Sequence, residues 1–298
     1  MDIIRVFQSF STQEQAIEYL EGVRWRGKPH CPYCGSFEVG RHASGDRAMS
    51  RLQFRDCSRA FSVTVGTLFH RTHIPLRNWF LVIALMLNAK KSASAYQIAR
   101  DLGMRRPTVW SMMHRVRAAM AEDEEQDRLL HGIIEADETY VGGKPRRSNN
   151  KDDHDNDKRG RGSRKKVPVV GAVERGGRVV AKVVDDCTRR TITKFLRRYI
   201  NTDGSLLITD EYAVYRRVRE MMFHAEIKHA QTYVQGQIHT NSIEGFWSLI
   251  KRAWYGSHHH YSRKYMPLYI AEACYKYNRR ESDRAFDNAV RAFVGAAA

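Results

Sequence analysis

The chain has few acidic residues, few cysteines and no long apolar run. Its 298 residues contain 33 Asp and Glu against 50 Lys and Arg, which gives a formal net charge of +17. This imbalance excludes an acidic disordered chain, disfavours a neutral metabolic enzyme and favours a polyanionic partner such as nucleic acid. The hydrophobic content of 42% is enough for a buried core, and the length suggests about two domains.

Signals for membrane insertion and secretion are also missing. The longest apolar run, residues 79–87, is far shorter than the roughly 20 residues of a membrane span. The first residues lack the basic start and apolar centre of a signal peptide, so we expect a cytoplasmic protein with no membrane partner. Five cysteines in a reducing compartment are poor disulfide candidates, and the spacing of Cys31 and Cys34 is typical of a metal-binding knuckle.

The first predicted domain covers residues 1–70. The pattern Ser11-x-x-Glu14 predicts the start of a short amphipathic packing helix. Beyond it, the cysteine pair, a glycine-containing middle and the alternating residues before Cys57 predict a small hairpin module.

The second predicted domain, residues 71–125, has helical periodicity. One apolar helix begins at Leu76, and two further helices are separated by Gly103, as in a helix-turn-helix. In that interpretation Arg105, Arg106 and Arg115 contact DNA phosphates. The alternative is a plain helical hairpin with a solvated basic face.

The third predicted domain, residues 126–298, follows an acidic linker and has an α/β pattern. The sequence predicts strands at 133–141, 167–173, 178–184 and 206–209, and a helix at 191–200. Between the first two strands, the basic loop 144–166 contains no large apolar residue and cannot bury a core. We expect it to be irregular, and its charge alone does not assign it to DNA.

Three acidic residues stand where a strand ends or a helix begins: Asp137, Asp210 and Glu244. Singly, each has a structural explanation, because Asp210 and the Asn241-x-x-Glu244 pattern fit helix caps. Together, two carboxylates on neighbouring strands and one on a helix form an oxygen ligand set for Mg²⁺ or Mn²⁺ in phosphoryl transfer. Period-two alternation places Glu135 and Asp137 on the same face of the strand, so the pattern leaves the choice between them open.

The predicted helix around Glu244 carries a polar stripe beside its apolar packing face. Glu244, Ser248, Lys251 and Tyr255 recur at helical spacing beside an apolar packing face. Lys251 and Arg252 are therefore candidate DNA-binding residues, and more cations interleaved with tyrosines follow them. Those tyrosines fit a nucleic-acid surface and a protein core equally well. The run 258–260 of three histidines receives no metal role, because consecutive side chains do not converge.

Several sequence motifs of this chain resemble those of a known family, the ISXO-like group of insertion-sequence transposases of the DDE superfamily. The matching strings are CPYCGS, FSVTVGTLFHRTHIPLRNWF, EADETYVGG, VVGAVERGGRV, TDEYAVY and HTNSIEGFWSLIKR, with HHHYSRKY and YKYNRR after them. They occur in the expected order over nearly the whole chain, and HTNSIEGFWSLIKR is the most specific.

The resemblance implies an α/β catalytic domain with an RNase H-like mixed sheet and flanking helices, preceded by a zinc-ribbon-like module and a helix-turn-helix. It implies that Asp137, Asp210 and Glu244 are the metal-binding catalytic triad, which favours Asp137 over Glu135. It also implies a DNA transposase that cleaves element ends and joins them to target DNA with Mg²⁺ or Mn²⁺, and that pairs two ends as a homo-oligomer.

The sequence departs from the family at the ribbon. Such ribbons carry two CxxC pairs. In this chain the second pair is incomplete, because Phe54 stands where its first cysteine is expected and only Cys57 is present. Cys31, Cys34 and Cys57 therefore supply three of the four ligands that a structural Zn²⁺ takes, and His30 or His42 is a candidate fourth. The alternative is a ribbon that has lost its metal.

Two other functions compete with the transposase. One is a DNA-binding regulator or an inactive transposase copy without catalysis, which has no reason to carry the ordered carboxylates. The other is an RNase H-like nuclease or resolvase that cuts without joining strands, which the residues alone do not separate from a transposase.

Overall fold

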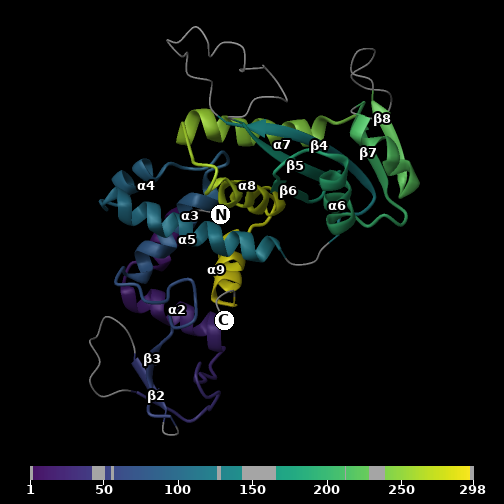
Figure 1. The fold of residues 1–298 in the computed structure, drawn as a ribbon. Coiled ribbons are helices and arrows are strands. Elements are labelled where there is room, and N and C mark those ends of the chain that lie inside the picture. The colour runs from purple at the N-terminus through teal and green to yellow at the C-terminus, as the bar shows by residue number, and fades with distance from the viewer. Residues whose placement is uncertain are drawn as a thin grey trace. The chain divides into compact units, whose positions relative to one another are not determined.

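The computed structural model describes residues 3–41, 51–54, 57–125, 129–142, 166–211, 213–227 and 239–295. The chain forms two compact units (Figure 1). The helical unit comprises Met1–Glu125 and Arg279–Ala298, and the sheet unit comprises Gln126–Asn278. The predicted basic loop 144–166 lies almost wholly outside the described residues, as does His42. Among the described residues, no helix is long and apolar enough to cross a membrane.

The helical unit contains helices around an aromatic core and a small three-stranded sheet. Its elements are α1 (Ile3–Ser9), α2 (Gln13–Trp25), β1 (Val39–Arg41), β2 (Arg51–Phe54), β3 (Ala60–Ser62), α3 (Leu76–Asn88), α4 (Ala95–Asp101), α5 (Arg106–Glu124) and α9 (Ala285–Gly295). The strands pair antiparallel in the order β1-β2-β3, as the predicted hairpin module requires. Helix α2 begins one residue later than predicted, because Thr12 and Gln15 form the capping box.

Helix α9 belongs to the helical unit, although the predicted third domain ran from 126 to 298. The reason is aromatic packing: the ring of Phe80 lies 4.8 Å from that of Phe10 and 5.7 Å from that of Phe286, which belongs to α9. Arg279 adds ion pairs to Asp123 and Glu124 of α5. The helical unit is therefore discontinuous in sequence.

Helices α4 and α5 are joined by a tight turn. Ser94 caps α4 by accepting a hydrogen bond from the backbone N–H of Gln97 (3.1 Å). Gly103 has φ +61 in the turn, a conformation that glycine adopts without strain. Pro107 lies in the first turn of α5, as predicted, where its missing N–H costs nothing.

The sheet unit contains a mixed five-stranded sheet. Its elements are β4 (Ile133–Val141), β5 (Val167–Glu174), β6 (Val179–Val183), α6 (Arg189–Tyr199), β7 (Leu206–Asp210), the 3-10 helix η2 (Ala213–Glu220), β8 (Phe223–Ile227), α7 (Asn241–Arg252), the π-helix η3 (Ala253–His258) and α8 (Met266–Asn278). The strand order is β6-β5-β4-β7-β8, with β4, β5 and β6 antiparallel and β4, β7 and β8 parallel. The predicted mixed sheet with flanking helices is confirmed.

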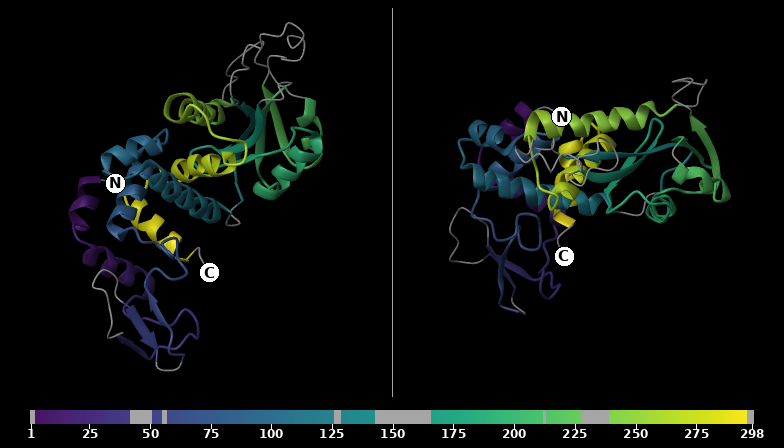
Figure 2. Two further views of the ribbon diagram at one scale, coloured as in Figure 1. Left: turned by 60° about the vertical axis from the view of Figure 1, so that its left-hand side comes forward. Right: turned by 45° about the horizontal axis from the view of Figure 1, so that its top comes forward.

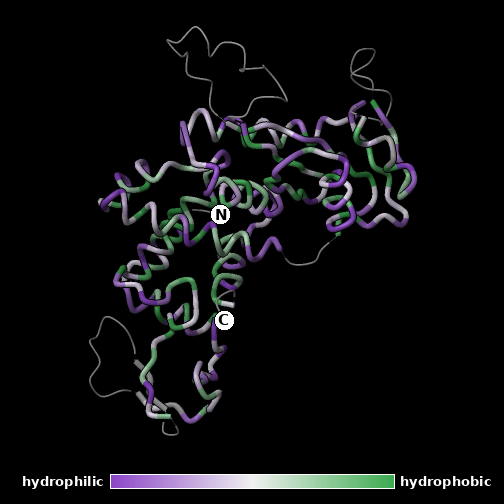
Figure 3. The backbone as a smooth tube through the Cα atoms, in the orientation of Figure 1, coloured by the Kyte–Doolittle hydropathy of each residue, from purple (hydrophilic) through white to green (hydrophobic). Residues whose placement is uncertain are grey.

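Both faces of this sheet are covered by helices, as the left view of Figure 2 shows. On one face, α7 and α8 bury residues such as Phe246 and Ile270 against β5 and β6. On the other face, α6 and η2 bury residues such as Phe195 and Tyr215 against β4 and β7. The central strands are therefore hydrophobic along much of their length (Figure 3).

Candidate active site

Asp137 and Asp210 lie on adjacent parallel strands. The register pairs Glu135 of β4 with Ile208 of β7, so continuing it by two residues places Asp210 beside Asp137. Both face the side of the sheet that α7 covers, because residues two apart on a strand share a face. Glu138 lies on the opposite face, where it accepts a hydrogen bond from the hydroxyl of Tyr215 (3.3 Å). The predicted alternation along β4 is therefore present.

The carboxyl group of Asp137 is partly buried among like charges. Burial, followed by the negative charge of Asp210, raises the pKa of Asp137 from 3.8 to about 6, and Glu244 adds a smaller push in the same direction. The indole Nε1 of Trp247 donates a hydrogen bond to Asp137 Oδ2 (3.0 Å) and opposes this rise. The three predicted carboxylates thus interact electrostatically in the structure.

A glycine gives Trp247 its place beside Asp137. Gly171 of β5 is the strand partner of Asp137. A Cβ atom added at Gly171 would lie 2.5 Å from Cη2 and 2.9 Å from Cζ2 of Trp247, so the indole occupies the space that any other residue would fill. The indole therefore depends on glycine at this position.

Glu135, on the same face of β4 as Asp137, anchors the start of α7. It is fully buried, and its Oε2 accepts hydrogen bonds from the backbone N–H groups of Ser242 (2.7 Å) and Ile243 (3.1 Å) at the start of α7. Its Oε1 accepts from the hydroxyl of Ser242 (3.0 Å) and from Nε of Arg175 (2.8 Å). The guanidinium of Arg175 also donates to the backbone oxygen of His239 (2.9 Å). Glu135 therefore caps α7 from a neighbouring strand.

This cap explains the position of Glu244. The N-cap of α7 is Thr240, and Asn241 is the first residue of the helix, so Asn241 is not the cap residue of the alternative capping box. Instead the Thr240 hydroxyl donates to Glu244 Oε1 (3.0 Å). Glu244 lies in the first turn of α7 and is exposed.

The two predicted stripes of α7 are both present. Ile243, Phe246, Trp247 and Ile250 are buried, as is Trp254 in η3. Lys251 and Arg252, the predicted DNA-binding pair, are exposed in the last turn. Tyr255 is 56% exposed and extends the stripe of Glu244 and Lys251.

The aromatic residues after α7 divide between the two predicted roles. Tyr261 is buried and stacks on Tyr269, with ring centroids 4.1 Å apart, so these two residues belong to the core. His258 packs its ring edge against both of them, which gives it a packing role. Tyr255 remains at the surface.

The arginines of the helical unit have different environments. Arg105 and Arg106 are exposed at the start of α5. Arg115 is partly buried: it donates to the backbone oxygens of Leu68 and His70 and lies 5.1 Å above the ring of Trp79. Burial also lowers the pKa of Arg115. Its guanidinium is thus used inside the unit, which differs from the phosphate contact predicted for it.

The three cysteines of the ribbon converge. Within the described ranges, Cys31, Cys34 and Cys57 are the one group of three ligand-type side chains whose donor atoms all lie within 4.8 Å of one another. The Sγ atoms of Cys31 and Cys57 are 3.7 Å apart. Burial opposes ionisation of Cys31, but hydrogen bonds from the backbone of Cys34 and Tyr33 outweigh it and lower the pKa of this thiol. These features fit a thiolate metal site.

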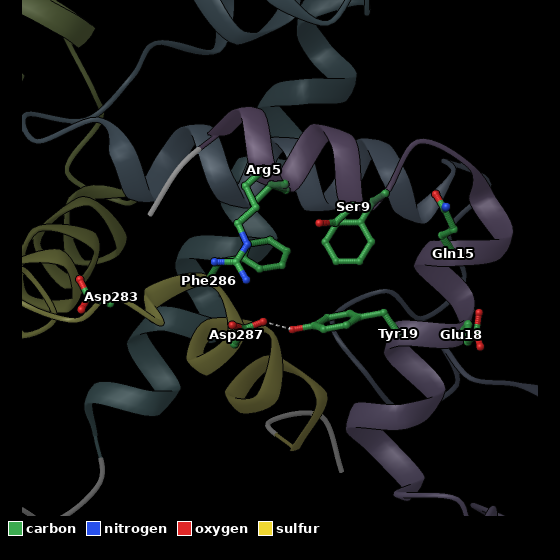
Figure 4. Close-up of a pocket in the computed structure, with 10 residues that line it drawn as sticks. Arg5, Ser9, Gln15, Glu18, Tyr19, Asp283, Phe286 and Asp287 are labelled. Atoms are coloured by element: carbon green, nitrogen blue, oxygen red, sulfur yellow. Dashed lines mark hydrogen bonds between the residues drawn. The ribbon is translucent and has the colours of Figure 1, made fainter.

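A pocket in the helical unit lies between α1, α2 and α9 (Figure 4). Its volume is about 530 Å³, and it is lined by charged and aromatic side chains. Across it, the hydroxyl of Tyr19 donates to Oδ1 of Asp287 (2.5 Å). This hydrogen bond joins α2 to α9, and the pocket contains none of the predicted site residues.

Two known protein families match this chain, one over the sheet unit and one over the N-terminal cysteine region. The family described as "ISXO2-like transposase domain" matches residues 129–278, and "Transposase zinc-ribbon domain" matches residues 11–59. The first match covers half of the chain and includes Asp137, Asp210 and Glu244. The chain belongs to the ISXO2-like transposase family and carries a transposase zinc-ribbon domain.

The chain is also similar to individual proteins and solved structures. A protein of Halobacterium salinarum, "Uncharacterized protein in transposable element ISH50", is 26% identical over 275 residues, covering 88% of this chain and 90% of that protein. The crystal structure of the Mos1 strand transfer complex aligns with 74% of this chain and 78% of that chain, at 12% identity and a TM-score of 0.27. A pre-cleavage Mos1 transpososome covers 99% and 96%, at 11% identity and a TM-score of 0.26.

Proposed function

We propose that this transposase cleaves DNA at the ends of its element and joins the freed ends to target DNA, with Asp137, Asp210 and Glu244 as the catalytic residues. The observation that carries the proposal is the coupling of these carboxylates. Two lie on adjacent parallel strands, and the pKa of Asp137 rises to about 6 partly because Asp210 and Glu244 are near it. An acid whose pKa is raised by burial and by neighbouring carboxylates is typical of a catalytic site.

The ligand set fits Mg²⁺ or Mn²⁺. All three candidates offer carboxylate oxygens, and hard divalent cations prefer such ligands. The repulsion that raises the pKa of Asp137 is relieved when a cation neutralises the group. When bound, the metal supplies Lewis-acid chemistry for attack at phosphorus. The chain itself holds the carboxylates at fixed positions, through the bond from Trp247 to Asp137 and the anchoring of α7 on Glu135.

DNA contact is proposed for exposed cations on each unit. In the helical unit, α4 and α5 act as a helix-turn-helix with Arg105 and Arg106 on phosphates. In the sheet unit, Lys251 and Arg252 lie beyond Glu244 on the same helix and bind the backbone near the reacting phosphate. Arg115 is left out of this set because its guanidinium bonds to backbone oxygens within the helical unit.

Zn²⁺ is proposed at Cys31, Cys34 and Cys57. Because structural zinc sites take four ligands, a fourth ligand completes the site, and His30, beside Cys31, is exposed and available. The active complex is proposed to be a homo-oligomer, since two element ends must be paired.

The proposal is tested by cleavage and strand transfer on DNA carrying the sequences that flank this gene, with Mg²⁺ or Mn²⁺. Asp137→Ala, Asp210→Ala and Glu244→Ala should each abolish end-specific joining. Asp203→Ala is the matched control, because Asp203 is an exposed carboxylate in a turn of the same unit, and it should keep full activity. Specific binding without cutting would support an inactive copy or regulator, and cutting without joining would support a nuclease. Cutting that survives all three changes would mean the active site lies elsewhere.

A further inference from the structure

Helix α6 has a strongly cationic outer surface that the proposed chemistry does not use. Its 11 residues include five cations and no acid. All five are exposed, and they are Arg189, Arg190, Lys194, Arg197 and Arg198. The opposite side of α6 buries Ile192, Phe195 and Leu196 in the core of the sheet unit. The helix is therefore held rigidly, with its charges directed to solvent.

This surface lies across the sheet from the carboxylates. The core beneath α6 contains residues of β4 and β7 such as Ile134 and Leu207. The indole that bonds to Asp137 belongs to the core on the other face, beneath α7. The two helices are visible on opposite sides of the strands in the left view of Figure 2. A DNA segment at the carboxylates would therefore lie on the face of the sheet opposite to α6.

Four of these five cations are not neutralised by acidic groups of the described residues. In the described part of the chain, no ion pair joins Arg189, Arg190, Lys194 or Arg197 to an acid. Asp185, just before the helix, lies 3.5 Å from Arg263. Asp186 accepts hydrogen bonds from the hydroxyls of Thr188 (2.7 Å) and Thr191 (2.6 Å). Both acids therefore have other partners.

The charge pattern works against the stability of the isolated helix. Arg189 and Arg190 lie in the first turn, where the positive end of the helix dipole disfavours cations. Arg190 and Lys194, and again Lys194 and Arg198, are like charges four residues apart, which repel. Phosphates bound along α6 would offset these repulsions.

We infer that the outer face of α6 binds the phosphate backbone of a second DNA duplex, separate from the one at the carboxylates. Residues four apart on this helix are about 6 Å apart along its axis, so several cations contact successive phosphates of one backbone. Contacts of these cations to phosphates carry no sequence information, so a random-sequence duplex is a suitable probe. The inference rests on the proposed function in taking DNA as the polyanion.

The test is the salt dependence of binding to a random-sequence duplex, using the whole protein. Each phosphate contact contributes about −0.9 to the slope of log K against log salt. Arg190→Gln/Arg197→Gln should therefore make the slope shallower by about 2, and glutamine preserves helix propensity. Arg284→Gln/Arg291→Gln is the matched control, since it removes the same charge from two exposed arginines of the helical unit. It should leave the slope unchanged.

A second measurement detects contact directly. Acetylation of Lys194, followed by mass spectrometry, should slow several-fold when the duplex is added, and should not slow with anionic lipid vesicles. An unchanged slope in the α6 variant, or protection of Lys194 by vesicles and not by duplex, overturns the inference. A wild-type protein that binds no duplex at all overturns the proposed function as well, so the two failures are distinguishable.

Discussion

The indole Nε1 of Trp247 donates a hydrogen bond to Oδ2 of Asp137 across 3.0 Å, joining helix α7 to strand β4 at the candidate active site. The sequence places Trp247 on the packing face of its helix, and the residue is indeed 3% exposed. It is thus a core residue that also orients a candidate catalytic carboxylate. Its effect on Asp137 can be measured separately from its packing.

Trp247→Phe should raise the pKa of Asp137 above its present value of about 6. The indole bond favours the ionised carboxylate, so its loss favours the neutral acid. The change also removes part of a buried ring, with an expected loss of about 1–3 kcal/mol in stability. Carbon-13 NMR titration of the aspartate carboxyl groups measures the pKa directly. A pKa that falls or stays constant would contradict the assigned role.

Asp137→Asn should stabilise the protein at neutral pH in buffer without Mg²⁺. The pKa of Asp137 is raised in the folded state, so the folded protein binds the proton more tightly than the unfolded chain. Stability from this group is therefore full below about pH 4 and is lost as pH rises to about 6. A difference of about two pKa units corresponds to roughly 3 kcal/mol at most.

Urea unfolding at pH 4 and pH 7.5 measures this effect. The variant should exceed the wild type at pH 7.5 and match it at pH 4. Chelators are omitted so that any metal at the cysteines is retained. Equal stabilities of the two proteins at pH 7.5 would show that the carboxylate is not under electrostatic strain.

Gly171→Ala should destabilise the sheet unit by about 1–3 kcal/mol, because the new methyl group collides with the indole of Trp247. It should also weaken end cleavage by displacing the partner of Asp137. Gly245→Ala is a suitable control: it lies on α7, an added Cβ there meets no atom within 4 Å, and alanine favours helix. The control should be neutral or slightly stabilising in thermal unfolding.

Glu135→Ala should cost about 3–5 kcal/mol, since it leaves Arg175 without its buried partner and the start of α7 without its cap. Asp137→Ala should lose activity with little loss of stability. Comparing the two variants in urea unfolding and in cleavage separates the anchor from the catalytic carboxylate. Reversed results would mean that Glu135 is the catalytic residue.

Cys57→Ser should release most of the zinc, because it removes one of three converging thiols. Elemental analysis of protein purified without chelator checks this, with Cys187→Ser as the control because Cys187 is in the sheet unit. Wild-type protein with far less than one zinc per chain would contradict the zinc site.

Much of the fold follows from local patterns. Strand β4 begins and ends where predicted, and helix α3 begins at Leu76 as predicted, because the hydrophobic period is strong in both. Helix α1 has only one buried residue, Val6, so its seven residues carry little periodic signal. The capping box of α2 was displaced by one residue because Ser11 and Thr12 both suit the position.

The site was harder to predict because its supports come from different elements. The pattern placed Glu135 and Asp137 on one face, but only tertiary structure shows that Glu135 caps a helix more than 100 residues away. Arg115 has the sequence context of a DNA contact, yet its carbonyl partners lie about 45 residues earlier. Gly171, within the apolar run of β5, was the one local signal that another residue packs closely against the strand. In the structure that residue is Trp247.

The return of α9 to the helical unit has a consequence for synthesis of the chain. Ribosomes release the N-terminal part first, and domains generally fold as they emerge. Here Phe286 and the other core residues of α9 emerge after the entire sheet unit. The unit that is translated first is therefore the last to be completed. A nascent chain stalled before α9 would have its carboxylates assembled while the core around Phe10 and Phe80 was still open, so unfinished copies should be recognised by chaperones and proteases through the helical unit.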